Sequence, residues 1–417
     1  MRPMGLMGLM GPIGLMSLIG LISLMGLVGC SDDEEATGNG VSQTLTVVPC
    51  AQSFAEVNDG EDAALTRAWT PPSPYVLYES LNGLFSSQKN LTNNSIGVFF
   101  TKNATDPLQA TFFHYKVGDN DRWRVSLDEL KEDDYFVYGF IPSEVVTTAS
   151  ITGNSSYSDG AVLTLNGIKT VTPNDVCVVV GAKKGSGPEN DDTGTLESPE
   201  RIQPGQFAVT TVASTKDSPV SGTGNNIFLL FDHLYSAIRF NFTVGEKYDA
   251  LRTIRLRKLE MIAYTDDSKT KIKAKYNATV RIKANTTGTL PITEVTFTPD
   301  TGSGDAVFEP LFNGEATLSH STPSSFMGCF VPGQTTRFTL RSTYDVYDKN
   351  TDHNDKGNLI RKECTAENYI NLPSLFTVTS LARGHIYTIN LIVQPTYLNV
   401  LSEPDVEDPE GVELIEN

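Results

Sequence analysis

The chain has 417 residues and a formal net charge of −18. A chain of this length can bury substantial cores and is expected to divide into about two domains. The acidic balance, with no cluster of Lys and Arg, argues against nucleic acid or anionic lipid as a partner, because phosphate groups would not be neutralised.

Residues 1–29 have the composition of a signal peptide. They are almost purely Leu, Met, Ile and Gly after a single Arg2, and Gly29 directly precedes Cys30. A positive start, an apolar core and small residues before a cleavage site are typical of a secretory signal. A cysteine just after that site predicts a lipoprotein, in which Cys30 becomes the first residue and carries lipid on its sulfur and amine. The alternative is a membrane-spanning helix, since the apolar stretch is long enough to cross a bilayer.

Residues 30–74 are predicted to form a flexible leader. They contain the acidic run SDDEE at 31–35 and the proline-rich segment PPSP at 71–74, and both disfavour regular packing. The apolar segment at 45–48 is long enough for a temporary strand that fills a groove of the same subunit.

Arg67 lies within this leader, among small and polar residues, and is followed by Ala68. Exposed segments of this kind are where proteases cut, and a basic residue suits a trypsin-like enzyme. We therefore predict proteolytic processing between Arg67 and Ala68. The alternative is that Arg67 is an ordinary linker charge.

From about residue 75 the pattern becomes β. Alternating side chains around a polar turn predict a hairpin, and segments that are apolar on both faces predict covered strands. The hairpin spans 113–127 with its turn at 118–122, the covered strands are 135–141 and 176–180, and 185–225 is a loop region with one short strand near 207–209.

A second β pattern begins near residue 226. Alternation predicts strands at 238–244, 254–263, 338–346 and 387–393, and the phase change at Arg257 predicts a bulge. Helix signals are scarce, with only a capping box at 126–129. The sequence thus predicts an all-β chain with two tandem antiparallel β-sandwich domains, 75–225 and 226–395, followed by an acidic carboxy-terminal arm, 396–417.

Motifs that would indicate catalysis or metal binding are missing from the sequence. The five histidines are scattered singly, and His233 is expected to be a packed residue at a strand end. Asp348 opens a segment like a calcium loop, but His353 stands where the turn needs glycine. We therefore expect no enzyme activity, no cofactor and no metal. The sequence leaves open whether Cys329 and Cys364 pair.

Several segments, in this order, resemble the fimbrillin-like family of Bacteroidetes surface pili. The acidic run after Cys30 is similar to the signal that sends Bacteroidetes lipoproteins to the outer cell surface. The other segments that carry the resemblance are TRA at 66–68, YFVYGFIP at 135–142, FDHLYSAIRF at 231–240 and LARGHIYTINL at 381–391.

This resemblance implies a fold and an assembly route. It implies two transthyretin-like β-sandwich domains, export as a lipoprotein of the outer membrane and exposure at the cell surface in a fimbria. It also implies removal of the leader after a basic residue, and polymerisation with other pilus subunits by strand exchange. A host or bacterial surface receptor would be the adhesive partner.

The carboxy-terminal arm offers a candidate donor strand. It contains the short apolar stretch Tyr397, Leu398, Val400 and Leu401 among acidic residues. Another subunit's extended segment can complete a sheet, with alternate side chains seated in pockets. The alternative is a disordered acidic tail.

A different class of function competes with the pilus subunit. A lipid-anchored glycan-binding protein of a polysaccharide-uptake system would present exposed aromatic side chains on a flat face. Trp69 and Trp123 are the only tryptophans, and one lies in the leader whereas the other alternates like a core residue. The sequence therefore favours the pilus subunit, and a hydrolase is a more distant alternative.

Overall fold

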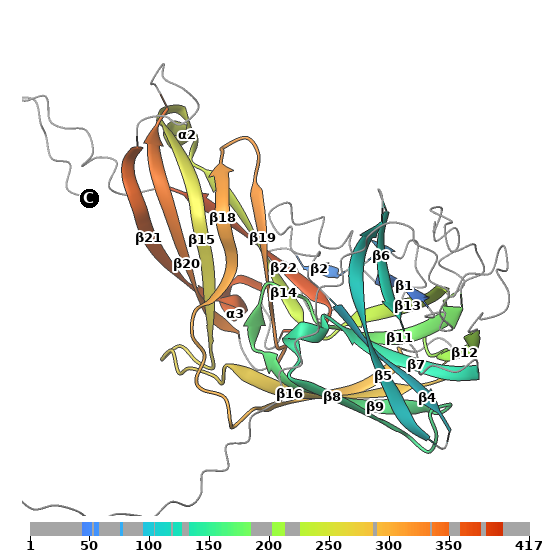
Figure 1. Ribbon diagram of the computed structural model, residues 1–417. Helices are drawn as coiled ribbons and strands as arrows, with labels where there is room; N and C mark the ends of the chain where they lie inside the picture. The colour runs from blue at the N-terminus through green and yellow to red at the C-terminus, as the bar shows by residue number, and fades with distance from the viewer. Residues whose placement is uncertain are drawn as a thin grey trace, which may run out of the picture. The chain divides into compact units, whose positions relative to one another are not determined.

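The computed structural model describes thirteen segments of the chain, and most of their residues lie in β-strands (Figure 1). These segments are residues 44–51, 54–57, 76–77, 95–103, 105–117, 120–126, 133–184, 202–212, 226–286, 290–333, 336–349, 359–376 and 381–394. Among these residues no helix is long and apolar enough to span a bilayer.

The largest sheet has nine strands. They are β1 (Thr44–Ala51), β3 (Val76–Leu77), β4 (Ser95–Lys102), β5 (Thr105–Val117), β6 (Asn120–Ser126), β7 (Asp133–Ile141), β11 (Cys177–Lys184), β12 (Ala208–Val212) and β13 (Asn226–His233). Successive hydrogen-bonded neighbours lead from β11 through β13, β1, β6, β5, β4 and β7 back to β11. These seven strands therefore form a closed ring of pairings.

Three smaller sheets contain the remaining strands. The second sheet has the order β10 (Val171–Thr172), β19 (Ser324–Phe330), β14 (Ser236–Val244), β22 (His385–Val393), β2 (Ala55–Val57). The third has the order β18 (Glu309–Leu318), β15 (Arg252–Tyr264), β20 (Arg337–Asp348), β21 (Leu359–Asn371). The fourth has the order β17 (Ile292–Pro299), β16 (Lys275–Lys283), β9 (Gly160–Lys169), β8 (Thr148–Gly153). The short helices are η2 (Ser143–Val145), α2 (Glu246–Leu251) and α3 (Leu372–Phe376).

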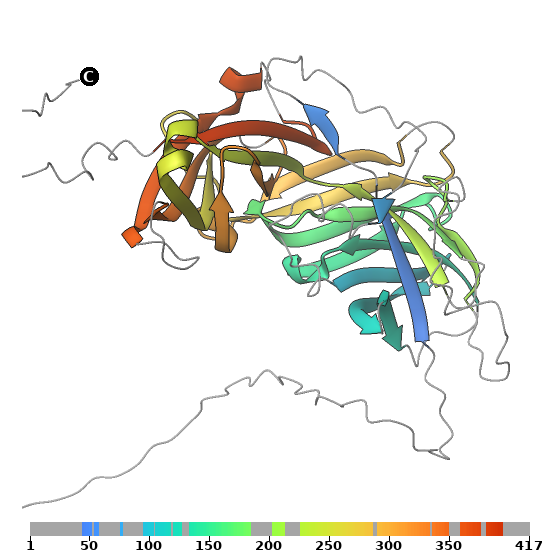
Figure 2. The same cartoon turned by 90° about the horizontal axis from the view of Figure 1, so that it is seen from above.

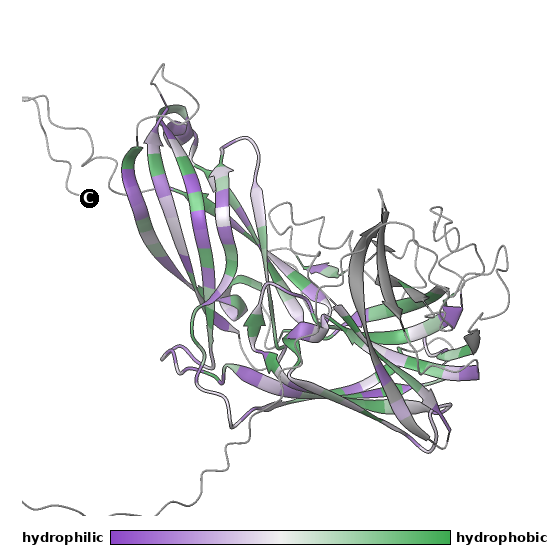
Figure 3. Ribbon diagram, viewed as in Figure 1, coloured by the Kyte–Doolittle hydropathy of each residue, from purple (hydrophilic) through white to green (hydrophobic). Residues whose placement is uncertain are grey.

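Side chains from these sheets form two hydrophobic cores. Strands of the first and fourth sheets supply most of one core, and strands of the second and third sheets supply most of the other. Apolar and polar residues alternate as stripes along β15 and β20 (Figure 3), which is the pattern of strands with one buried face. The predicted all-β sandwich fold is confirmed. The ladders are mixed, however, because β1–β13, β14–β22 and β2–β22 are parallel pairs.

The predicted hairpin, covered strand and bulge are confirmed where the hydrophobic pattern of the sequence is strong. β5 and β6 form the predicted hairpin, and their pairing extends to Val117 and Asn120. β7 is buried on both faces from Val137 onward, as its apolar sequence predicts. The bulge is confirmed, since the register of β15 shifts between Leu256 and Lys258. Neither α2 nor α3 was predicted, and most of the predicted capping box lies outside the described residues.

The sheets do not separate at residue 225. β13 pairs with β11, and β16 pairs with β9, so strands on either side of that position share two sheets. The described part of the chain after residue 41 forms one compact unit. Folding of residues 75–225 and 226–395 as separate domains stays a prediction.

The centre of β7 generates a test of the fold. Gly139 pairs with Val98, and a methyl group on Gly139 would collide with the backbone carbonyl oxygen of Gly97. Because that oxygen belongs to a neighbouring strand, it cannot rotate away. Gly139→Ala should lower the free energy of unfolding by about 1–3 kcal/mol, measured by urea denaturation.

A second glycine supplies the control. Gly304 is exposed, and a methyl group there would meet nothing within 4 Å. Gly304→Ala should change stability by no more than about 0.5 kcal/mol. Equal effects of the two substitutions would contradict the close approach of β7 and β4.

Candidate functional site

The first part of the site is β1, a strand of the predicted leader that lies inside the largest sheet. β1 lies between β13, to which it is parallel, and β6, to which it is antiparallel. Figure 2 shows β1 in dark blue beside the yellow-green β13. The side chain of Val47 is 1% exposed and belongs to the first core. β1 includes the apolar segment 45–48. This part of the leader is therefore a strand of the sheet, whereas the leader as a whole was expected to be flexible.

A second leader strand, β2, lies at the edge of the second sheet next to β22 (Figure 1). It pairs only with the start of β22, from His385 to Tyr387. Among the described residues, the same edge of β22 has no partner beyond Tyr387, and Ile392 on that part is 64% exposed. An edge of this kind is a template for another strand.

Side chains fix β2 in place. Val57 is 1% exposed and belongs to the second core. Glu56 accepts two hydrogen bonds of 2.9 Å from the guanidinium of Arg239 on β14. Because the Glu56 carboxylate is about half exposed, solvent screens this pair, and burial of Val57 contributes more of the stability.

Phe54 directly precedes β2 and covers a buried polar cluster. Its ring stacks on the imidazole of His233, with centroids 3.8 Å apart and an interplanar angle of 19°. His233 is fully buried at the end of β13, as its predicted role requires, and its Nδ1 lies 2.5 Å from Oδ2 of Asp175. The thiol of Cys177 lies 3.0 Å from the same oxygen and 3.5 Å from the same nitrogen.

This cluster is not arranged for nucleophilic catalysis. Burial raises the pKa of the Cys177 thiol well above its usual value, and the nearby Asp175 carboxylate acts in the same direction. The thiol therefore stays protonated and donates to Asp175. A catalytic relay also needs the carboxylate and the nucleophile on different imidazole nitrogens, whereas here both face Nδ1 of His233.

A buried ion pair joins segments 231–240 and 381–391, two of the segments that carry the family resemblance. Arg383 donates a hydrogen bond of 2.7 Å to Oδ2 of Asp232 and another of 2.7 Å to the carbonyl oxygen of His233. Asp232 is fully buried. Loss of the arginine would leave an uncompensated buried carboxylate, at a cost of about 3–5 kcal/mol.

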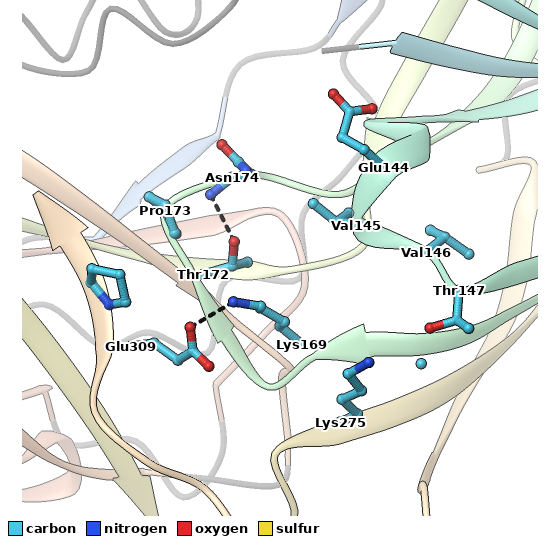
Figure 4. Close-up of a pocket in the computed structure, with 12 residues that line it drawn as sticks. Glu144, Val145, Val146, Thr147, Lys169, Thr172, Pro173, Asn174, Lys275 and Glu309 are labelled. Atoms are coloured by element: carbon cyan, nitrogen blue, oxygen red, sulfur yellow. Dashed lines mark hydrogen bonds and ion pairs between the residues drawn. The ribbon is translucent and has the colours of Figure 1, made fainter. Parts of the chain in front are cut away.

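The described residues also line a cavity of about 290 Å³ beside η2 (Figure 4). Lys169 and Glu309 form an ion pair of 2.7 Å in its wall, and Glu144 accepts hydrogen bonds from Ser95. No aromatic side chain lines this cavity, whose apolar lining is supplied by Val and Pro. It therefore lacks the stacking surface that a glycan-binding protein would use.

The remaining predicted site residues divide into two groups. Cys30, Arg67, Ala68, Tyr397, Leu398, Val400 and Leu401 lie outside the described residues, so the predictions made for them stand as predictions. Cys329 and Cys364 lie in different cores and do not form a disulfide with each other. Trp123 lies in β6, and Trp69 lies outside the described residues.

Comparison with known proteins gives no match to any family model or curated protein. Among solved structures, the chain is similar to a putative cell adhesion protein from Bacteroides fragilis NCTC 9343 (12% identity, 85% of this chain and 94% of that chain, TM-score 0.37). It is also similar to a fimbrial protein from Bacteroides vulgatus ATCC 8482 (11% identity, 84% and 95%, TM-score 0.28). A further similar structure is the fimbrial anchor protein Mfa2 from Porphyromonas gingivalis (8% identity, 83% and 90%, TM-score 0.25).

The contact of β2 with the second core generates a prediction. Val57→Ala removes two buried methyl groups and should weaken docking of β2 by about 1.5–2 kcal/mol. Backbone amides in the β2–β22 ladder should then exchange with deuterium roughly tenfold faster or more. The matched control is Val307→Ala, because Val307 is 57% exposed and its truncation should leave exchange unchanged. Unchanged exchange in Val57→Ala would mean that Val57 does not hold β2 in place.

Proposed function

We propose that this chain is a structural and adhesive subunit of a cell-surface fimbria, assembled by strand exchange after lipoprotein export and leader cleavage. One observation carries the proposal. β1 lies before the predicted cleavage site at Arg67 in the sequence, yet it occupies an interior position between β13 and β6. A segment that proteolysis would remove therefore supplies part of the largest sheet.

Removal of β1 would create a defined acceptor. β13 and β6 would each expose a row of unpaired N–H and C=O groups, and the ring of seven paired strands would open. The first core would also lose the buried side chain of Val47. An extended segment from another subunit could fill this groove and pair with both β13 and β6.

The carboxy-terminal arm has a sequence that suits this groove. Leu398 and Val400 are two residues apart, like Leu45 and Val47 of β1. Side chains at this spacing lie on the same face of a strand, so an extended arm can present a leucine and a valine to the groove. In the proposed assembly, the arm of one subunit replaces the leader of the next.

The order of elements along the chain explains why a lipoprotein would end in a polymer. Cys30 and β1 both precede Arg67, so one cut after Arg67 releases the lipid anchor and the strand together. The groove thus stays filled during export and opens at the outer membrane. The partners in this scheme are other pilus subunits, and a host or bacterial surface receptor is the target of adhesion.

The glycan-binding alternative has no observation in its favour among the described residues. The cavity beside η2 lacks aromatic side chains, and the ring of Phe54 stacks on the buried imidazole of His233. The proposed role includes no catalysis.

The cleavage step is tested with Arg67→Ala. Assembled fimbriae from the unmodified chain should contain subunits that begin at Ala68, as read by mass spectrometry of the amino terminus. Arg67→Ala should remain a lipid-bound monomer, because the protease lacks its basic residue and β1 stays in the sheet. Thr66→Ala, which changes the neighbouring residue and keeps the arginine, should assemble normally. Fimbriae whose subunits still begin at Cys30 would contradict the proposal.

A further inference from the structure

We propose that Asp175, Cys177 and His233 form a binding site for a divalent transition-metal cation of the zinc type. The site lies where β11 and β13 meet. It goes beyond the fimbrial role and does not depend on it, because the three ligands lie in or next to β11 and β13 and not in the leader. The sequence led us to expect no metal, since His233 is 56 positions from Cys177 and no ligand motif links them.

Sheet register brings the three residues together. Cys177 and His233 are directly opposed partners in the antiparallel β11–β13 ladder. Opposed residues have Cβ atoms about 5 Å apart, which allows both side chains to reach one ion. Asp175 lies two residues before Cys177, so it supplies a donor from the same stretch of chain. The donor atoms of all three residues lie within 4.8 Å of one another.

The distances between donor atoms approach those of a tetrahedral zinc site. Zinc–sulfur and zinc–nitrogen bonds of about 2.3 and 2.0 Å imply a sulfur–nitrogen separation of about 3.5 Å. The separation between Sγ of Cys177 and Nδ1 of His233 is 3.5 Å. Oδ2 of Asp175 lies closer to both, at 3.0 and 2.5 Å. A shift of this carboxylate by roughly 1 Å would therefore complete the geometry of three ligands.

The chemistry of the set also favours zinc over magnesium or calcium. Imidazole and thiolate are ligands for zinc and other borderline-soft cations, whereas magnesium and calcium prefer oxygen alone. On binding, the thiol of Cys177 gives its proton to solvent and its sulfur bonds the ion. The imidazole of His233 must also move its proton from Nδ1, which faces Asp175, to Nε2, so that Nδ1 is free to bond the ion. The thiolate and the Asp175 carboxylate then balance the two positive charges of the ion with no oxidant or reductant.

Neighbouring groups leave this set of ligands intact. The Asp232 carboxylate is engaged by Arg383 and by the backbone N–H of His233, so its charge is balanced elsewhere. In the uncleaved chain, Phe54 of the leader also covers one face of the imidazole of His233. A ligand ring held in this way is pre-oriented, which supports metal affinity.

The experiment measures metal in the full chain, purified in detergent and dialysed against metal-free buffer. After incubation with Zn²⁺ and a second dialysis, elemental mass spectrometry should find about one zinc per chain. Cys177→Ser should reduce bound zinc at least tenfold. Cys364→Ser, which removes a buried thiol from the other core, should retain it.

A second readout does not depend on the folding of a variant. Titration of the unmodified chain with Co²⁺ should produce a thiolate-to-cobalt charge-transfer band in the near ultraviolet at one equivalent. A folded chain that gives no such band and retains no zinc would overturn the proposal. Equal zinc retention by folded Cys177→Ser, checked by circular dichroism, would also overturn it.

Discussion

The structure depends on the hydrogen-bonding requirement of β13. An interior strand needs a partner on each side, because unpaired N–H and C=O groups are costly when they are removed from water. β11 supplies one partner of β13, and the leader strand β1 supplies the other. The same leader strand also completes the pairing of β6. The short strand β1 thus supplies hydrogen-bonding partners for one edge of β13 and one edge of β6.

A second constraint acts at the junction between β13 and β14. Only Leu234 and Tyr235 separate these strands, and both are fully buried, so the chain passes from the first sheet to the second within the cores. The phenol of Tyr235 donates to the carbonyl oxygen of Lys169, and its own carbonyl accepts from the N–H of Gly384. Arg383 adds the buried ion pair with Asp232. This junction holds together strands from distant parts of the sequence. Phe54 of the leader contacts it by stacking on His233.

The sequence predicted those features that one strand encodes by itself. Alternation in β14 and the phase change at Arg257 in β15 were visible because burial of one face sets the side-chain pattern. Parallel partners such as β22 for β14 were not visible, because pairing between distant strands leaves no local signal. The short helices were missed because α2 contains no buried residue and α3 spans only one turn or so.

The sequence indicated one strand of the candidate site but none of its contacts. The segment at 45–48 indicated a strand, and β1 contains it, but nothing in the sequence identified β13 and β6 as its neighbours. His233 was expected to be a packed residue, whereas its proximity to Asp175 and Cys177 depends on the register of two strands. The roles of Phe54 and Glu56 were not predicted, because their partners, His233 and Arg239, lie far away in the sequence.

Electron cryomicroscopy of assembled fimbriae, at a resolution that shows side chains, tests the central claim most directly. The strand between β13 and β6 should be residues 397–401 and their neighbours from an adjacent subunit, and residues 44–51 should be absent from the polymer. A map in which residues 44–51 of the same chain still occupy that position would contradict strand exchange through this groove.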